Sequence, residues 1–348
     1  MILRARPAGS TARGTLLPCK RTEIAMPAWT RRAPSRFRTP VQSVASIELL
    51  RSSTTMKSII TVCCLFFAAS VFAADRIVQR DLAYVEPKNE RQSLDVFAPA
   101  AGKNHPVVVW IHGGGWQRGD KSGALLKPQA FVDRGFVFVA INYRFVPVVN
   151  IKQMTGDVAK AIHWAHRNAE KYGGDPNTIF VMGHSAGAQR AALVCTDDQY
   201  LKAEGLPLSL IKGCVPVDGD TYYPALQIDS ADADLDGRLL GGARRAASYR
   251  LKFPEGSQKE LSSVLHVAKD KGIPPFLILH VADFPESGTG LQAQVLAKAL
   301  NDAKVPVKVV SVPGKTHVTL DSEIGKPNDA ATDALFEFAR ARVPANRN

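Results

Sequence analysis

The chain has 348 residues, of which 45% are apolar, and a formal net charge of +12. This length and apolar content are enough for the core of one large α/β domain or two small ones. The charge is uneven, because residues 1–74 carry +9 of the +12 and only +3 remains for residues 75–348. The basicity therefore belongs to the leader, and the near-neutral body excludes a polybasic nucleic-acid-binding domain.

Residues 1–55 combine ten Arg and Lys with scattered Pro and Ser and show no hydrophobic periodicity, which predicts a disordered basic leader without a core. A basic arm for nucleic acid and an Arg-rich organelle transit peptide are two interpretations. The third is a start codon assigned too far upstream. We favour the third, because a complete export signal begins at Met56, and the leader is then not part of the native product.

Residues 56–74 have the three parts of a secretory signal peptide: Lys57, an apolar run over 59–74, and small residues ending at Ala73 and Ala74. The run has 16 residues, fewer than the roughly 18 expected of a spanning helix, so a cleaved signal is favoured over a signal anchor. We expect cleavage after Ala73 or Ala74, no stable membrane anchor, and a secreted or periplasmic product.

The body of the chain alternates strand and helix patterns. Two alternating segments, 82–85 and 92–97, predict an antiparallel edge pair, and continuous apolar runs predict strands buried on both faces. This alternation predicts a doubly wound, mostly parallel sheet in a domain spanning 75–348. The expected strands are 106–111, 136–141, 178–182, 211–217, 275–281 and 305–312, and the expected helices are 125–134, 151–172, 186–196, 291–303 and 329–342.

The stretch from about 218 to 272 interrupts this alternation and is longer than an ordinary connection, which predicts a lid or cap insertion. Within it, residues 232–237 match the first half of a calcium-binding loop. The twelfth position of that loop is Ala243, where a bidentate Glu is required. We therefore expect a solvated acidic segment and no metal site.

Two glycine-rich motifs carry the chemistry. The elbow GHSAG at 183–187 presents Ser185 on a sharp turn between a strand and a helix, and HGGGW at 112–116 follows the apolar run 107–111. Glycine backbones leave N–H groups unobstructed, so Gly114, Gly115 and Ala186 are expected to form an oxyanion hole. Together the motifs predict acyl transfer.

A serine nucleophile needs a histidine base that a carboxylate orients. His317 follows the run 305–312 in a glycine-containing turn, and Asp283 follows the run 275–281, so both lie where the order Ser, acid, His places them. Asp218 and Asp220, after 211–217, are alternatives to Asp283. Of the remaining candidates, His112 is expected to brace the oxyanion loop, His184 to point away from the site, and Asp321 to cap a helix.

Cys195 and Cys214 remain once the leader and signal are removed. An export compartment permits a disulfide between them, and two buried free thiols are an equally good interpretation.

From about Asp81 to its end, the chain resembles the α/β-hydrolase superfamily, in the HGGGW and GxSxG carboxylesterase branch of hormone-sensitive-lipase-like, bacterial feruloyl-esterase-like and kynurenine-formamidase-like enzymes. The most specific stretches are 109–116, 119–121, 183–188 and 278–283. The resemblance implies Ser185, Asp283 and His317 as the triad. The pair Gln189-Arg190 departs from the His-Leu common in these relatives, which leaves the pocket wall open.

The function we expect is hydrolysis of a small-molecule carboxylic ester through an acyl-enzyme, with no metal or organic cofactor. An arylformamidase or amidase with the same triad is the nearest alternative. A non-catalytic extracellular binding module is another, although such proteins usually lose a triad member and this chain keeps all three. Acyl and alcohol specificity and oligomeric state stay open.

Overall fold

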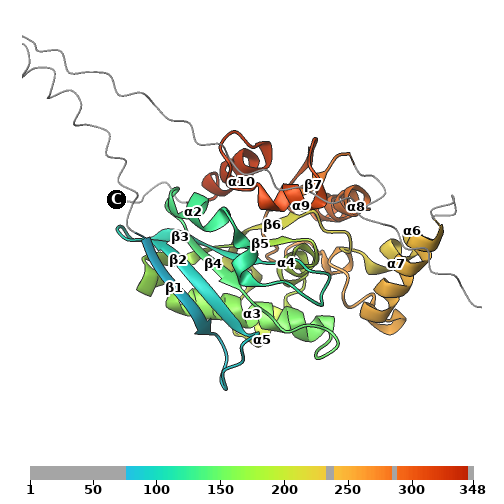
Figure 1. Ribbon diagram of the computed structural model, residues 1–348, viewed down its shortest axis with the longest axis horizontal. Coiled ribbons are helices and arrows are strands. Elements are labelled where there is room, and N and C mark those ends of the chain that lie inside the picture. Colours follow the sequence, from blue (N-terminus) through green and yellow to red (C-terminus); the bar gives the residue numbers. More distant parts are fainter. Residues whose placement is uncertain (1–75, 233–238, 284–287, 344–348) are drawn as a thin grey trace, which may run out of the picture. The chain divides into compact units, whose positions relative to one another are not determined.

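The computed structural model describes residues 76–232, 239–283 and 288–343 (Figure 1). Its centre is an eight-stranded sheet with the order β1-β2-β4-β3-β5-β6-β7-β8. The pairs β1·β2 and β2·β4 are antiparallel and the remaining neighbours are parallel. The strands are β1 (Arg76–Ala83), β2 (Ser93–Pro99), β3 (His105–Ile111), β4 (Val137–Ile141), β5 (Gly174–His184), β6 (Ile211–Val217), β7 (Phe276–Val281) and β8 (Val307–Val312).

Helices cover both faces of this sheet, which makes it doubly wound. Buried residues of α3, α4 and α8 join the core on one face, and buried residues of α2, α9 and α10 join the core on the other. The helices are α2 (Lys127–Val132), α3 (Ile151–Asn168), α4 (Ala186–Thr196), α5 (Gln199–Ala203), α6 (Pro224–Asp232), α7 (Leu239–Lys252), α8 (Thr289–Asp302), α9 (His317–Ser322) and α10 (Ala330–Arg340).

Strand β3 shows why the central runs are apolar throughout. Val107, Val109 and Ile111 belong to the core under α3 and α4, whereas Val108 and Trp110 belong to the core under α2 and α10. Successive side chains of a strand point to opposite faces, so a strand covered on both sides needs apolar residues at every position. The continuous runs are therefore the mark of the sheet centre.

The predicted fold class is confirmed. Each predicted strand is present, 211–217 with the predicted ends and the others with one or both ends shifted. The helix expected at 125–134 begins only at Lys127, because Lys121–Ala124 form a 3₁₀ turn and Leu125 has a φ of 54°. The short helices α5 and α9 are additions to the prediction. The leader, the signal peptide and most of the calcium-like loop lie outside the described residues, and the lid assignment for 218–272 stays a prediction.

Two observations concern the membrane and the thiols. Within the described ranges, no helix is both long and apolar enough to cross a bilayer. Cys195 and Cys214 are both buried and both free. The Cys214 thiol lies 3.4 Å from the Ala191 carbonyl oxygen. Of the two interpretations of this pair, the structure has the buried thiols.

Candidate active site

Ser185 occupies the turn between β5 and α4, with a φ of 57° and a ψ of −123° that a non-glycine residue rarely adopts. The two glycines of the elbow are required by close approach. A Cβ on Gly183 would lie 2.3 Å from the Gly187 carbonyl oxygen, and one on Gly187 would lie 2.2 Å from that of Ile111. The strained turn holds the serine hydroxyl at the carboxyl edge of the sheet.

His317 is the first residue of α9, whose start is fixed by a capping box between Thr316 and Thr319. Its Nε2 accepts the hydrogen bond of the Ser185 hydroxyl at 2.9 Å. Its Nδ1 donates to Asp218 Oδ2 at 2.6 Å. Serine, histidine and carboxylate therefore form one continuous line, contributed by the ends of β5, β8 and β6.

The carboxylate that is hydrogen-bonded to His317 belongs to Asp218. The prediction that Asp283 makes this contact is therefore wrong. Asp218 is fully buried, and its Oδ1 accepts the backbone N–H of Val281 at 3.0 Å. Asp283 is exposed, and its carboxylate accepts the backbone N–H of Gly314 at 2.5 Å. Asp283 thus braces the loop that leads to His317.

Sequence order alone does not separate the two acids. β6 and β7 both lie between β5 and β8 in the sheet, so a residue after either strand lies near the histidine. What distinguishes Asp218 is its backbone, which has a φ of 51° and donates from its N–H to Leu279 at 2.7 Å. This conformation turns the carboxylate toward His317, and neither residue type nor spacing encodes it.

Burial and charge act in opposite directions on the two titrating members of the triad. Desolvation lowers the pKa of His317, but the hydrogen bond and charge of Asp218, with the charges of Asp220 and Asp321, raise it above its ordinary 6.5. Burial would raise the pKa of Asp218, but the hydrogen bonds from His317 and Val281 hold it below its ordinary 3.8. Asp218 is therefore an ionised acceptor at neutral pH.

The HGGGW loop lies directly against the nucleophile. A Cβ on Gly113 would lie 3.0 Å from the Ser185 Cβ, which places the loop backbone beside the Ser185 side chain. Gly114 and Gly115 have φ values of 121° and 60°, and Ala186 is the first residue of α4, where helical N–H groups have no acceptor in their own helix. These are the three predicted donors, and their role as an oxyanion hole stays a prediction.

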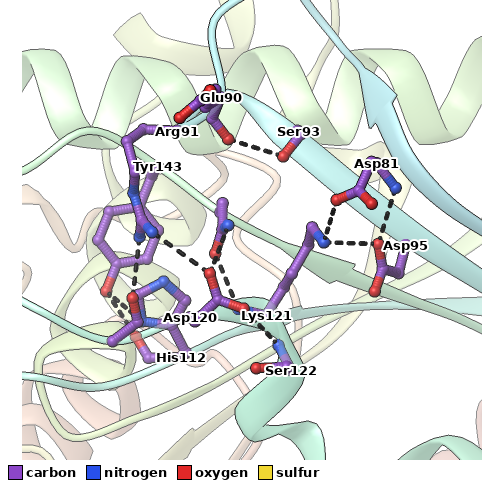
Figure 2. Close-up of polar contacts among 12 residues, drawn as sticks. Asp81, Glu90, Arg91, Ser93, Asp95, His112, Asp120, Lys121, Ser122 and Tyr143 are labelled. Carbon is purple, nitrogen blue, oxygen red and sulfur yellow. Dashed lines mark hydrogen bonds and ion pairs between the residues drawn. The ribbon is translucent and has the colours of Figure 1, made fainter.

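A polar network fixes the far end of this loop (Figure 2). Arg91 donates to the Gly119 carbonyl at 2.9 Å and pairs with Asp120 at 3.3 Å. The Asp120 carboxylate also accepts from Asn142 at 2.8 Å. Lys121 extends the network to β1 and β2, with its Nζ 2.7 Å from an oxygen of Asp81 and 2.8 Å from one of Asp95.

His112 braces the near end of the loop, as expected. Its Nδ1 donates to the Gly113 carbonyl at 2.7 Å, and its own carbonyl accepts the Tyr143 hydroxyl at 2.6 Å. The two rings stack with centres 4.3 Å apart. Burial lowers the pKa of His112 to about 4, so this histidine stays neutral and structural at neutral pH.

Helix α7 and the residue after it form an aromatic wall behind the oxyanion loop. Trp116 packs edge-on against Tyr249 at 5.9 Å and Phe253 at 5.2 Å between ring centres. The Tyr249 hydroxyl donates to Asp220, two residues after the triad acid. Burial raises the pKa of Asp220 above its ordinary value. Segment 218–272 thus contributes both the triad acid and a wall beside the oxyanion loop.

The atypical pair after the elbow is internal. Gln189 and Arg190 are both fully buried, so neither provides an exposed pocket surface. The indole N–H of Trp116 lies 3.4 Å from Gln189 Oε1. The Arg190 guanidinium lies 4.5 Å from the Tyr143 ring centre and donates to the Ala186 carbonyl. The pair therefore supports the oxyanion loop from inside the protein, through Trp116 and Ala186.

Several of these contacts carry no sequence signal of their own. Arg91, Tyr143 and Tyr249 come from segments far from both motifs, and only the tertiary structure brings them to the loop. Asp120 is the exception, because it follows HGGGW in the stretch 119–121 that carries the family resemblance. No cluster of three or more potential metal ligands occurs in the part of the chain that the structure describes.

Comparison with known proteins finds relatives that are named esterases. The family model described as BD-FAE matches residues 94–212. An isoprenylcysteine alpha-carbonyl methylesterase of Arabidopsis thaliana is 32% identical over 78% of this chain, and a probable one of Oryza sativa is 33% identical over 75%. Esterase LipQ of Mycobacterium tuberculosis is 27% identical over 66% of this chain. The chain spans only 55–63% of the length of these relatives.

Solved structures show the same fold at lower identity. Fungal esterases from Rhizomucor miehei match with a TM-score of 0.60 and 22% identity over 77% of this chain and 84% of theirs. Esterase B of Lactobacillus rhamnosis matches with a TM-score of 0.60 and 19% identity over 77% of this chain and 85% of its own. The sheet order and these structures give the chain an α/β-hydrolase fold, and its GHSAG elbow and its relatives make it similar to carboxylesterases.

Proposed function

We propose that this protein hydrolyses small-molecule carboxylic esters through an acyl-enzyme intermediate. The hydroxyl oxygen of Ser185 attacks the ester carbonyl while His317 Nε2 takes its proton. The same proton then passes to the departing alcohol oxygen as the C–O bond breaks. In the second half, His317 takes a proton from water, whose oxygen attacks the acyl carbonyl. The bond from that carbon to the Ser185 oxygen then breaks, His317 returns the proton to Ser185, and the acid leaves.

The observation that carries this proposal is the line from Ser185 through His317 to Asp218, at 2.9 Å and 2.6 Å. Both distances are hydrogen-bond lengths, so the base is already aligned with the nucleophile. Asp218 holds the ring in the tautomer that leaves Nε2 free to accept a proton. The charge of Asp218 also favours the imidazolium that forms during each step.

The relatives support an ester as the substrate. The relatives described above are named methylesterases and esterases, and no observation favours a formamide or amide substrate. A non-catalytic binding module fits poorly, because serine, histidine and acid are all aligned.

Steady-state kinetics on p-nitrophenyl acetate tests the proposal. We expect wild-type hydrolysis, near-complete loss in Ser185→Ala, and a lower kcat/KM on N-formylkynurenine than on the ester. Equal rates for wild type and Ser185→Ala would overturn the role of the serine. A higher kcat/KM on N-formylkynurenine would make the protein a formamidase with the same machinery.

We also propose that the protein is exported. The support is the signal pattern over 56–74, followed by a body of low net charge. Expression from Met56, the favoured start, in a bacterial host, with N-terminal sequencing of the periplasmic or secreted product, tests this. We expect a new N-terminus at Ala74 or Asp75, and an uncleaved cytoplasmic product would contradict export.

A further inference from the structure

A buried lysine lies behind the catalytic histidine. Lys127 is the first residue of α2, and its side chain is 0% exposed. Its Nζ lies 2.9 Å from Asp321 Oδ1 and donates to the Asp321 carbonyl at 2.7 Å, while the Trp110 ring centre lies 5.2 Å away. An ammonium without water is costly to bury, so this placement requires its carboxylate partner.

Asp321 links this lysine to the active site. It lies in α9, four residues after His317, and is not the cap of that helix, because Thr316 has that position. Its Oδ2 is 3.8 Å from His184 Nδ1. The other ring nitrogen of His184, Nε2, donates to the His317 carbonyl at 2.9 Å, and the two imidazole rings lie 4.5 Å apart.

The path therefore runs from Lys127 through Asp321 and His184 to the backbone of His317, and it joins α2, α9 and the end of β5. It is separate from the contact of Asp218, which holds the imidazole through Nδ1. His184 thus contacts the base, although the sequence suggested that it points away. All three side chains of the path are at least 87% buried.

We propose that Lys127, Asp321 and His184 are positioning residues for the catalytic base: His184 fixes the His317 backbone, and Lys127 neutralises the carboxylate of Asp321 beside the imidazole. The inference rests on the proposed function only in taking His317 as the base. None of the three residues touches the reacting atoms, so they act through His317.

The charges around His317 allow the effects of Lys127 and Asp321 on its pKa to be distinguished. The imidazole faces Asp218 and Asp220 from the segment after β6, Asp321 from its own helix, and His184 from β5. Removing the charge of Asp321 should lower the pKa of His317, because one of the carboxylates that favour the imidazolium is lost. Removing Lys127 should raise it, because Asp321 is then no longer neutralised.

The direct test is the titration of His317 followed by NMR in the resting protein, with the resonance assigned by His317→Gln. We expect the midpoint to move to lower pH in Asp321→Asn and to higher pH in Lys127→Met. Lys308→Met is the matched control, since it removes one lysine from the exposed pair with Glu337 and should leave the midpoint unchanged. Coincident midpoints in wild type, Asp321→Asn and Lys127→Met, or shifts in the same direction, would overturn the proposal.

A double variant that lacks both charges gives a second comparison, which can still be made if Lys127→Met alone does not fold. In Lys127→Met/Asp321→Asn the neutral pair is replaced by neutral side chains, so the midpoint should return toward that of wild type. A double variant that titrates like Asp321→Asn would contradict neutralisation by Lys127. Because NMR needs no substrate, a failure of the proposed ester hydrolysis does not affect these outcomes.

The role of His184 is tested by a conservative pair. Gln offers an N–H in place of Nε2–H, whereas Leu offers none, so we expect His184→Leu to lose on the order of tenfold or more in kcat with KM little changed. His184→Gln should recover most of that loss. Equal kcat values for the two variants would show that the hydrogen bond to His317 does not position the base.

Discussion

At the scale of single residues, Asp218 and Asp283 lie near the same histidine in different roles. Asp218 Oδ2 contacts the imidazole, whereas Asp283 contacts the backbone N–H of Gly314. We expect Asp218→Asn to lower kcat/KM by on the order of 10³- to 10⁴-fold, because the ring is then held in the wrong tautomer.

Asp283→Asn is the matched comparison, because it makes the same chemical change on the neighbouring strand end. We expect a loss within about tenfold, since the Asn side-chain oxygen still accepts from Gly314. Kinetics on one ester at one pH decides between them. A larger loss in Asp283→Asn than in Asp218→Asn would return the catalytic acid to Asp283.

The pH dependence of the reaction follows from the raised pKa of His317. The base works only when neutral, and a raised pKa keeps it protonated to higher pH, so kcat/KM should fall on the acid side with a midpoint above 6.5. Asp218→Asn removes the main cause of the rise and should move this midpoint to lower pH. A pH profile of kcat/KM on an uncharged ester tests both, and a wild-type midpoint below 6.5 would contradict the electrostatic account.

At the scale of elements, the oxyanion loop depends on side chains that hold it from outside. Arg91 contacts both the Gly119 carbonyl and Asp120 (Figure 2), so Arg91→Ala should lower kcat by roughly tenfold through a loosened loop, with a smaller change in KM. Arg80→Ala is the control, because Arg80 pairs with Asp95 and is 58% exposed. Equal kcat values for the two variants would show that Arg91 does not support the loop.

Phe253, the residue after the end of α7, contributes stability as well as part of the aromatic wall. Phe253 is fully buried against Trp116, so Phe253→Ala should lower the free energy of unfolding by about 3–5 kcal/mol. Leu251, in the last turn of α7, is 85% exposed, and Leu251→Ala should change the free energy of unfolding by less than about 0.5 kcal/mol. Urea unfolding of both variants measures this. A loss of under 1 kcal/mol in Phe253→Ala would mean that Phe253 does not pack on Trp116 as described.

The elements that the sequence predicts best are those that local pattern determines. Continuous apolar runs locate the central strands, and the glycines of the elbow locate the strained turn at Ser185 because a side chain at either position would clash. The sequence pattern does not predict α9, because this helix has only six residues and its start is fixed by a capping box. The sequence pattern does not identify Asp218 as the acid that contacts the histidine, because a positive φ directs its carboxylate and sequence spacing does not reveal φ.

At the scale of the whole molecule, the site is a product of sheet order. Ser185 and His317 are 132 residues apart in sequence, yet parallel strands with a common edge bring them within hydrogen-bond distance. The order of motifs along the chain therefore predicts the nucleophile and the base. It does not predict side-chain contacts between segments distant in sequence, such as Arg91 with Gly119 or Lys127 with Asp321.

The central claim is that Ser185 is an activated nucleophile, and covalent labelling by a fluorophosphonate probe tests it most directly. Intact-mass and peptide analysis of the wild-type protein should show one adduct, on the peptide that contains Ser185. Ser185→Ala should remain unlabelled, and His317→Gln should label far more slowly. A wild-type protein that stays unlabelled, or a Ser185→Ala variant that labels at the wild-type rate, would contradict the claim.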